Sequence, residues 1–262
     1  MIGLAGCGCM GQPMLRALRD GGSGAIGFDI VEKDPAWITN DAQHFASTLE
    51  TLFVVVPDEA QVRELLFDGQ KLVQRSANLS RIVLCSTISP RAIPDLTARL
   101  PNHIALIDAP MAGSERSAQN RNLTFMLGGT NADIDELTPL LVSMGDVIHR
   151  MGPLGAGMTA KAISNLVIAS NTAVTRFVFD WADSSGLDRQ KLSSLINETS
   201  GQDRFTPNFR ADASLKDGDG SVHTIDALVK DLAAAIDAAP KGADLALAQT
   251  IMNCLQNRKP RD

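Results

Sequence analysis

Two polar residues, Lys161 and Asn165, stand four positions apart in a stretch that otherwise repeats apolar side chains at helical spacing. On a helix such a pair shares one face, so the two polar tips can meet at one point. An amine placed in this way can take a proton from a hydroxyl group or return it, as an acid/base catalyst must. For Lys161 alone, a solvated lysine at a helix start is the competing interpretation.

The stretch that carries this pair predicts one long helix from Met158 to Asp183. A glycine-rich loop at residues 152–157 precedes it, and at about 1.5 Å per residue the helix would span roughly 39 Å, long enough to cross between two domains. Its apolar side chains are predicted to be core or subunit interface rather than a ligand site. These side chains include Ile163, Leu166, Val167, Val174, Phe177, Val178, Phe179 and Trp181.

Near the start of the chain, residues 6–11 read Gly-Cys-Gly-Cys-Met-Gly, directly after a predicted strand and opening a predicted helix. In this pattern Gly6 permits the tight turn, Gly8 lets the backbone approach a pyrophosphate, and Gly11 lets helix pack on strand. The helix N-terminus can then hold the anion. A glycine-rich turn without a ligand is the alternative interpretation.

Asp29 ends the next predicted strand, about twenty residues beyond the glycines. A carboxylate at this position can accept both ribose hydroxyls of an adenosine and would repel a 2′-phosphate, so the cofactor is predicted to be NAD rather than NADP. Lys33 is the one nearby cation that would soften this preference. The alternative is a solvated aspartate at a strand end.

Three further segments follow predicted strands, at the edge where such sheets bind ligands. Val56 and Pro57 follow one strand, and Thr87, which can reach a nicotinamide, follows the next. Ser89 is better explained as a helix cap. The third segment is the loop of residues 108–114, where Gly113 lets the chain turn and successive amides can form a nest for a carboxylate. By itself this loop is equally well an ordinary connection.

The first half of the chain alternates short apolar runs with helical ones, which predicts an α/β fold with a Rossmann-type, doubly wound, mostly parallel sheet. Predicted strands are residues 1–5, 25–29, 52–56, 81–86, 103–108, 123–128 and 146–150, and predicted helices are 13–20, 58–67, 90–100 and 132–144. Only helical periodicity follows, broken at Gly186, Gly201, 216–221 and 240–242, and a frayed tail is expected at 257–262. We therefore expect a dinucleotide-binding domain at 1–152 and an all-helical domain for substrate binding and oligomerisation at 153–262.

The composition excludes several classes of partner. With 44% hydrophobic and 21% charged residues the chain is an ordinary globular one, and its net charge of −6 offers no basic surface to nucleic acid or an anionic membrane. The four cysteines and four histidines lack the spacing of a metal site. No basic leader precedes the first strand, so a cytoplasmic location with reduced thiols is expected.

Several segments in joint spacing resemble the 3-hydroxyisobutyrate dehydrogenase family, the β-hydroxyacid dehydrogenases. The resemblance runs from the first residue to about Ala239 and is carried by Met-Gly-Gln-Pro-Met at 10–14, Asp-Ala-Pro at 108–110, Gly-Ala-Gly at 155–157 leading to Lys161 and Asn165, and Lys-Asp-Leu at 230–232. It implies a Rossmann-type domain, a long bridging helix, an all-helical second domain, and a homodimer or homotetramer.

The resemblance also implies roles for individual residues. Lys161 takes the position of the catalytic lysine and Asn165 that of its orienting asparagine. Motifs and resemblance together assign NAD binding to Gly6, Gly8, Cys9, Met10, Gly11, Asp29, Val56, Pro57, Thr87 and Lys230. Substrate binding is assigned to Ala112, Gly113, Ser114 and Arg116.

Two departures from the family pattern concern the substrate side. The carboxylate loop of the family usually reads Ser-Gly-Gly, whereas residues 112–114 here are Ala-Gly-Ser. Downstream, where small residues are typical, this chain has Glu115, Arg116 and Arg121. We expect Arg116 to meet a second anionic or polyhydroxy end of the substrate.

These observations predict an NAD-dependent dehydrogenase that interconverts a small hydroxy acid and its oxo or semialdehyde acid by hydride transfer. Burial and the positive nicotinamide would both favour the neutral amine that Lys161 needs as a base. An imine-reductase-like oxidoreductase is one alternative, although relatives of that kind usually replace the lysine. A catalytically inactive NAD-binding regulatory protein is another, suggested by Ala112.

Overall fold

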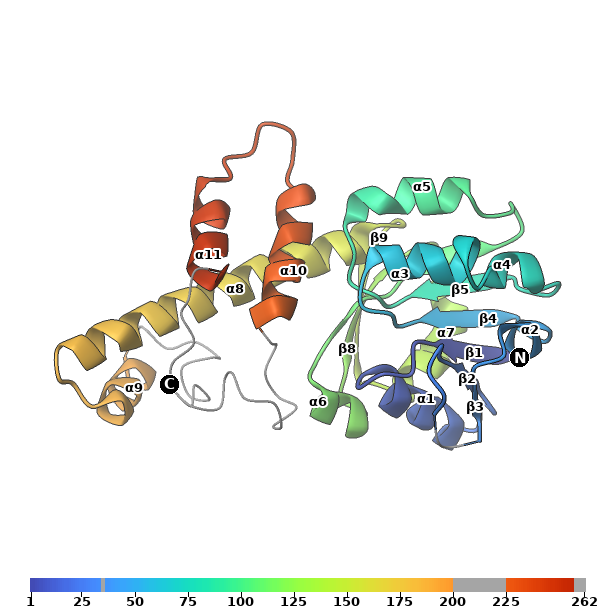
Figure 1. Cartoon of the computed structure of the whole chain (residues 1–262), viewed down its shortest axis with the longest axis horizontal. Coiled ribbons are helices and arrows are strands. Elements are labelled where there is room, and N and C mark those ends of the chain that lie inside the picture. The colour runs from blue at the N-terminus through green and yellow to red at the C-terminus, as the bar shows by residue number, and fades with distance from the viewer. Residues whose placement is uncertain (34–35, 200–224, 257–262) are drawn as a thin grey trace. The chain divides into compact units, whose positions relative to one another are not determined.

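The computed structural model describes residues 1–33, 36–199 and 225–256 of the 262-residue chain. It divides into two compact units, Met1–Ala162 and Ile163–Asp262, and the division falls inside the long helix α8, Ala156–Ser184 (Figure 1). The predicted breaks at Gly201 and 216–221 and the predicted fraying of 257–262 lie outside the described residues.

The first unit is built on one sheet, which has nine strands within the described residues. The strands are β1 Ile2–Ala5, β2 Ile26–Phe28, β3 Ile38–Thr39, β4 Thr51–Val54, β5 Arg81–Leu84, β6 Ala105–Asp108, β7 Met111–Ala112, β8 Thr124–Gly128 and β9 Val147–Gly152. Their order is β3-β2-β1-β4-β5-β6-β8-β7, and β9 pairs with β8. Only the β6–β8 and β7–β8 pairs are antiparallel, so the carboxyl ends of β1, β2, β4, β5 and β6 share one edge.

Short helices connect these strands. They are α1 Gly11–Asp20, α2 Ala42–Ala46, α3 Glu59–Arg63, the π-helix η1 Glu64–Asp68, α4 Leu72–Arg75, the 3₁₀-helix η2 Pro90–Ala92, α5 Ile93–Ala98, α6 Glu115–Gln119 and α7 Asn131–Val142. The predicted start at Asp58 is confirmed, because its side chain accepts the amide hydrogen of Gln61 at 2.8 Å and caps α3. Ser89 likewise caps η2 through the amide of Arg91.

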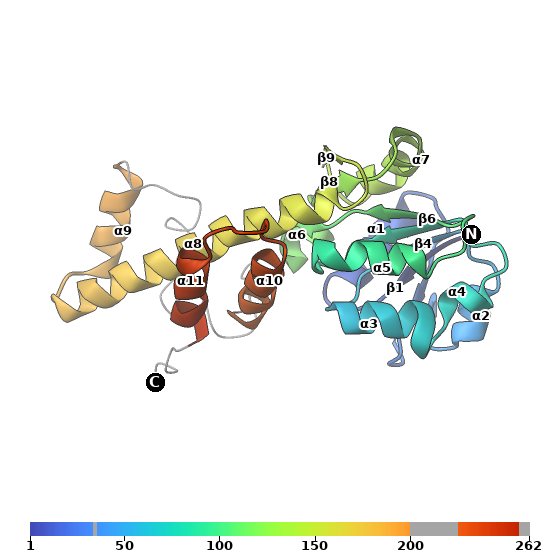
Figure 2. The ribbon, with the colours of Figure 1, turned by 90° about the horizontal axis from the view of Figure 1, so that it is seen from above.

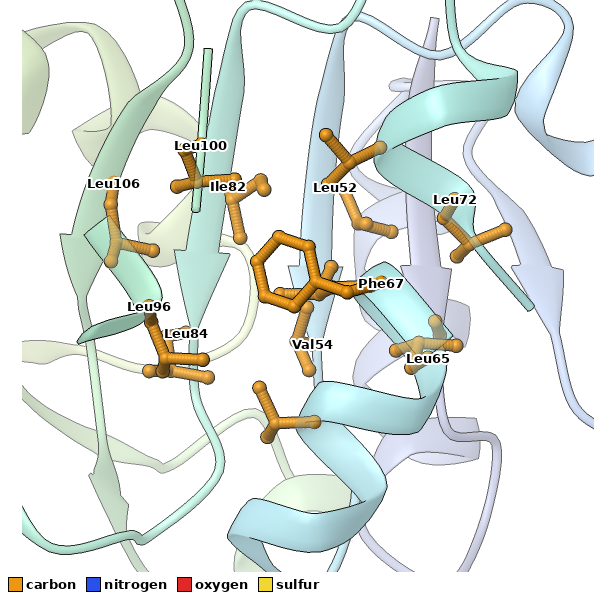
Figure 3. Packing of buried hydrophobic residues seen from close by; sticks show 14 of the residues in the cluster. Leu52, Val54, Leu65, Phe67, Leu72, Ile82, Leu84, Leu96, Leu100 and Leu106 are labelled. Carbon is orange, nitrogen blue, oxygen red and sulfur yellow. The ribbon is translucent and has the colours of Figure 1, made fainter. Parts of the chain in front are cut away.

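Apolar side chains cover both faces of this sheet. On one face, helices α3, α4 and α5 pack against β4, β5 and β6 (Figure 1). Figure 3 shows Phe67 at the centre of this cluster among leucines from strands and helices. On the other face, Met14 and Leu15 of α1 and Leu137 of α7 pack against Phe53 and Ile107. Each fully buried side chain of this size contributes roughly 1.5–3 kcal/mol, so the two clusters dominate the stability of the unit.

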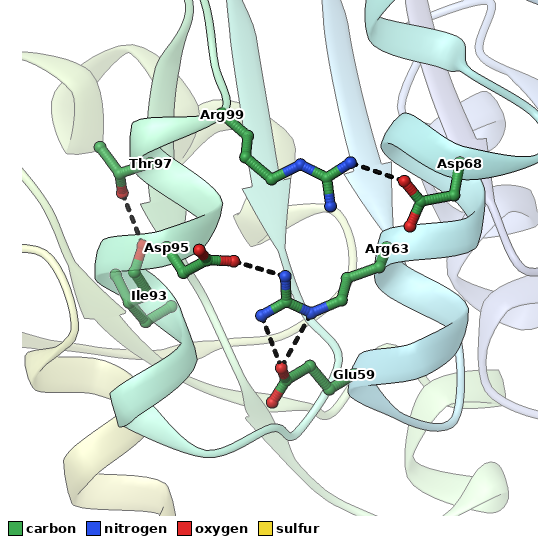
Figure 4. Close-up of polar contacts among 7 residues, drawn as sticks. All are labelled: Glu59, Arg63, Asp68, Ile93, Asp95, Thr97 and Arg99. Carbon is green, nitrogen blue, oxygen red and sulfur yellow. Dashed lines mark hydrogen bonds and ion pairs between the residues drawn. The ribbon is translucent and has the colours of Figure 1, made fainter.

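Two arginines join η1 and α3 to α5 at the surface (Figure 4). Arg63 pairs with both Glu59 and Asp95, and Arg99 pairs with Asp68 at 2.6 Å. The hydrogen bond from Arg99 lowers the pKa of the Asp68 carboxyl. Exposed pairs of this kind typically contribute only about 0–1 kcal/mol each, so they fix the helix positions more than they stabilise the fold.

The second unit is helical throughout its described residues. It contains most of α8 together with α9 Arg189–Asn197, α10 Ile225–Asp237 and α11 Ala246–Gln256. Ala169 and Ala173 of α8 pack against Leu228 and Leu232 of α10 and Ile251 of α11. Both views place α10 and α11 beside each other and along α8 (Figure 2). Small residues on this side of α8 therefore allow the close packing.

The opposite side of α8 carries large apolar side chains that are exposed among the described residues. Their exposed fractions are Ile163 60%, Val167 56%, Val174 59%, Phe177 51% and Trp181 64%. Of the two predicted roles for this stripe, core or subunit interface, the exposure of these residues excludes core and leaves subunit interface as a prediction, whereas Phe179, at 2% exposed, is buried in the interior. We call the five exposed residues the α8 stripe.

By length and composition alone, α8 is also the one described helix that is apolar enough to cross a membrane, a test that core helices of soluble proteins pass as well. Its buried side chains include Lys161, Asn165 and Arg176. Groups of this kind are costly inside a bilayer, which argues against such a placement.

The seven predicted strands are confirmed as β1, β2, β4, β5, β6, β8 and β9, and the four predicted helices of the first half are confirmed, all with ends within two residues. The elements that the sequence did not predict are β3, β7, α2, α4 and α6. None of them is longer than five residues, too short to show a period.

Candidate active site

The glycine turn has the geometry that its sequence predicts. Gly6 has φ +92°, and a Cβ built there would lie 2.4 Å from the carbonyl oxygen of Val55. A Cβ on Gly11 would lie 1.8 Å from the carbonyl oxygen of Gly6, so only glycine allows α1 to start this close to the turn. At Gly8, by contrast, an added Cβ would meet nothing within 4 Å. The backbone at Gly8 is thus open to a ligand, and no side chain caps the N-terminus of α1.

Asp29 is bound to this turn directly. Its Oδ2 accepts the amide hydrogen of Cys7 at 3.0 Å, and its Oδ1 accepts that of Val31 at 3.0 Å. The Cys7 thiol lies 3.5 Å from the carbonyl oxygen of Phe28, and burial raises its pKa to about 12, so it stays protonated and can donate there. Cys7 therefore stabilises the turn, whereas Cys9 is exposed.

At the ends of β4 and β5 the structure places Val56 against Gly6 and Ser86. The Cγ1 atom of Val56 lies 3.0 Å from the position of a Cβ on Gly6, and its amide donates to Ser86 Oγ at 2.9 Å. Pro57 is exposed and Thr87 is half-buried. The sequence had given no role to Ser86, which joins the two strand ends.

In the loop after β6, Ser114 has a structural role that the sequence had not predicted. Its hydroxyl accepts the amide hydrogen of Ser117 at 3.2 Å and caps α6, so it already has a structural partner. Gly113 has φ +144°, and Ala112 pairs with Thr124 in the sheet. Arg116 is exposed on α6, whereas Arg121 is bound to Asp20 of α1.

Asp108, at the end of β6, holds the start of α8. It is fully buried, and its two oxygens accept the amide hydrogens of Gly155 at 2.7 Å and Met158 at 2.6 Å. Burial raises the pKa of Asp108, although these amides act in the opposite direction. A Cβ on Gly128 would lie 2.2 Å from Asp108 Oδ1, and one on Gly157 would lie 2.9 Å from Oδ2. Both glycines therefore make room for this carboxylate.

Lys161 follows less than one helical turn after Met158 and is only 2% exposed. A lysine is rarely buried to this extent unless its amine has a specific partner or task. The interpretation of Lys161 as a solvated lysine at a helix start is therefore wrong. The hydrogen bonds from Asp108 to the first turn of α8 fix the position of the helix backbone just before Lys161.

In the second unit, Asn165 is 1% exposed and donates from Nδ2 to Asp231 Oδ2 at 2.7 Å. Asp231, also buried, has Lys230 Nζ 3.3 Å from its other oxygen. The sequence had not assigned a role to Asp231. Asp231 lies in the Lys-Asp-Leu segment that the family resemblance had picked out. Because it is 66 residues from Asn165, the sequence gave no reason to pair the two side chains.

Family models match nearly the whole chain. Residues 1–152 match the NAD binding domain of 6-phosphogluconate dehydrogenase, and residues 155–260 match the NAD-binding domain of NADP-dependent 3-hydroxyisobutyrate dehydrogenase. The chain belongs to the 3-hydroxyisobutyrate dehydrogenase family. It is an NAD-dependent β-hydroxyacid dehydrogenase of that family.

Individual relatives are similar to this chain over most of their length. The 2-(hydroxymethyl)glutarate dehydrogenase of Eubacterium barkeri is 25% identical over 92% of this chain and 83% of its own. The NAD-dependent L-serine dehydrogenase of Pseudomonas aeruginosa is 28% identical over 76% of this chain and 70% of its own. The solved structure of Mycobacterium tuberculosis 3-hydroxyisobutyrate dehydrogenase with L-serine superposes with a TM-score of 0.81, at 25% identity, over 96% of this chain and 91% of that one.

The cofactor of this 3-hydroxyisobutyrate dehydrogenase family member is of the NAD type. The glycine turn suits such a cofactor, because the open backbone at Gly8 and the uncapped start of α1 can receive a pyrophosphate. Within the described residues, no three His, Cys, Asp or Glu side chains gather as a metal site would require.

Proposed function

We propose that this enzyme interconverts a small hydroxy acid and its oxo or semialdehyde acid, with Lys161 as the acid/base and Asn165 as its orienting partner. The observation that carries the proposal is the burial of Lys161 at 2% exposure, on the helix start that Asp108 holds at the end of β6. The Gly-Ala-Gly turn before it and Asn165 one helical turn after it match the family pattern.

When bound, NAD supplies the acceptor or donor of hydride. In the oxidation direction the unprotonated amine of Lys161 takes the proton of the substrate hydroxyl, and in reduction the protonated amine returns it. Asn165 contributes a neutral amide that can hold the amine or the substrate without adding charge. In this proposal Gly6, Gly8, Cys9, Met10 and Gly11 receive the pyrophosphate.

The remaining assignments concern the two ends of the cofactor and the substrate. We assign Asp29 to the adenosine ribose, Val56, Pro57 and Thr87 to the nicotinamide side, and Lys230 to the border of cofactor and substrate. Ala112, Gly113, Ser114 and Arg116 are assigned to the substrate acid. Since the Ser114 hydroxyl caps α6, its contribution would come through the backbone of the turn at Gly113.

Replacing Lys161 by Ala tests the proposal. Turnover should fall by at least about two orders of magnitude, because the proton transfer loses its catalyst, while NADH binding measured by fluorescence titration stays unchanged. Lys191→Ala, an exposed lysine of α9, removes the same charge elsewhere and should keep full activity. Unchanged turnover in Lys161→Ala would rule the role out.

A panel of hydroxy acids followed by NADH absorbance would identify the substrate. It should contain three- to six-carbon acids, among them 3-hydroxyisobutyrate, L-serine, L-threonate and 2-(hydroxymethyl)glutarate, since relatives are named for these. Because Asp29 would repel a 2′-phosphate, kcat/KM should be at least about tenfold higher with NAD than with NADP. Turnover of no acid in the panel would contradict the proposed substrate class.

We also propose that the enzyme is a homodimer or homotetramer in the cytoplasm, with a functional boundary at residues 152/153. The α8 stripe supports the assembly, because its residues follow one another at spacings of four, seven, three and four positions, as an interhelical seam requires. All four cysteines, which lie within the described residues, are free thiols, in keeping with a reducing compartment.

A further inference from the structure

The contact between Asn165 and Asp231 decides which way the Asn165 amide faces. A carboxylate accepts hydrogen bonds and does not donate them, so the NH₂ group of Asn165 must point at Asp231 Oδ2. The reversed amide would set oxygen against oxygen in a buried place, which is strongly unfavourable. Lys230 Nζ lies 3.3 Å from the other carboxylate oxygen as an ion pair, although that oxygen accepts no hydrogen bond among the described residues.

As a result, Asn165 Oδ1 points away from Asp231, and it is buried without a hydrogen-bond partner among the described residues. A buried acceptor left without a partner costs free energy, so native proteins rarely keep one. The cost is recovered if a donor arrives when the substrate binds. Lys161 lies one turn earlier on the same helix, and hydroxy acids bring donors of their own.

We propose that Asp231 is a positioning residue of this enzyme, which acts by fixing Asn165 Oδ1 as the acceptor for an N–H or O–H donor of the substrate complex. The proposal rests on the proposed function, because the donor is either the Lys161 amine or a further donor group of the substrate. Asp231 itself then touches neither substrate nor cofactor and works through the Asn165 amide alone.

Asp231→Asn tests this directly, because it keeps the shape of the side chain but offers both a donor and an acceptor. The Asn165 amide can then face either way, and kcat/KM per folded site should fall about tenfold, the effect of one lost hydrogen bond. A loss in kcat with every substrate assigns the donor to Lys161, whereas a rise in KM confined to substrates with a second donor assigns it to the substrate. Asp226→Asn, an exposed position on the same helix, is the matched control.

A double substitution separates positioning from mere folding. Asn165→Asp alone sets two carboxylates in contact and should lower the melting temperature. Combining it with Asp231→Asn restores one amide–carboxylate hydrogen bond, with the two side chains exchanged. The double variant also keeps an acceptor oxygen at position 165. The double variant should regain the wild-type melting temperature. Its activity should be at least tenfold higher than that of Asn165→Asp alone.

Wild-type kcat and KM in Asp231→Asn, with turnover abolished in Lys161→Ala, would overturn the positioning role and leave the proposed function standing. Full turnover in Lys161→Ala would overturn both. A double variant that regains stability but no activity would also contradict the role of Asn165 Oδ1.

Discussion

The two units of the chain bury their apolar side chains to different degrees. In the first, two large apolar clusters cover both faces of the sheet, and strands such as β4 contribute side chains to each. In the described residues of the second, one smaller cluster joins α8, α10 and α11, and the five residues of the α8 stripe are more than half exposed. The first unit therefore buries its core within one chain, whereas in the described part of the second unit the α8 stripe remains open, as the assembly proposed above requires.

Helix α8 belongs to both units, and different contacts fix its start and cover its later turns. Its start is fixed inside the first unit by Asp108, through backbone amides that any sequence would offer. Its later turns depend on side chains, with small residues facing α10 and α11 and large ones facing outward. Damage at the start should therefore affect folding, and damage on the stripe should affect assembly.

Asp108→Ala should have the largest effect. It leaves the amides of Gly155 and Met158 without their acceptor inside the core, so the free energy of unfolding in urea should fall by roughly 2–4 kcal/mol. Asp135→Ala, which removes only an exposed pair with Arg150, should cost less than about 1 kcal/mol. Equal losses in the two variants would mean that Asp108 does not hold α8.

Phe177→Glu should have an intermediate effect, confined to the second unit. A charge in the α8 stripe would have to be buried on association, so light scattering should show monomers for Phe177→Glu and the proposed dimers or tetramers for the unchanged enzyme. Gln249→Glu, on the exposed side of α11, should leave the assembly intact. An unchanged molecular mass in Phe177→Glu would place the subunit interface elsewhere.

Arg116→Ala should have the smallest effect and should leave both units folded. Arg116 is exposed, so its loss should raise the KM of the best substrate several-fold through one lost anion contact, with the melting temperature unchanged. Arg16→Ala, on the exposed side of α1, controls for the lost charge. If KM does not change, Arg116 does not meet the substrate.

The sequence was sufficient for the long elements and for the glycine turn. Continuous apolar runs marked β4 and β5, and the positions of Gly6 and Gly11 followed from close backbone approach, which only glycine allows. Lys161 and Asn165 were singled out by their spacing and by the family resemblance, and both are buried; their catalytic roles stay a prediction.

What the sequence did not predict depends on contacts between distant segments. Asp108 and Gly155 are 47 residues apart, and Asn165 and Asp231 are 66 apart, so no local pattern connects them. The α8 stripe has the periodicity of a core helix, and periodicity does not say whether the same chain or a second copy covers it. The capping of α6 by the Ser114 hydroxyl was likewise not predicted, because α6 is too short to show a period.

The two amide contacts of Asp29 have a consequence for engineering. Because the same carboxylate that would discriminate between the dinucleotides also clamps Cys7 and Val31, removing it loosens the phosphate-binding turn along with the selectivity. A redesign toward NADP would need a replacement acceptor for the Cys7 amide, such as a Ser or Asn hydrogen-bonding group, before any arginine is added. If Asp29 has the proposed role, cofactor selectivity and the order of the turn depend on the same carboxylate.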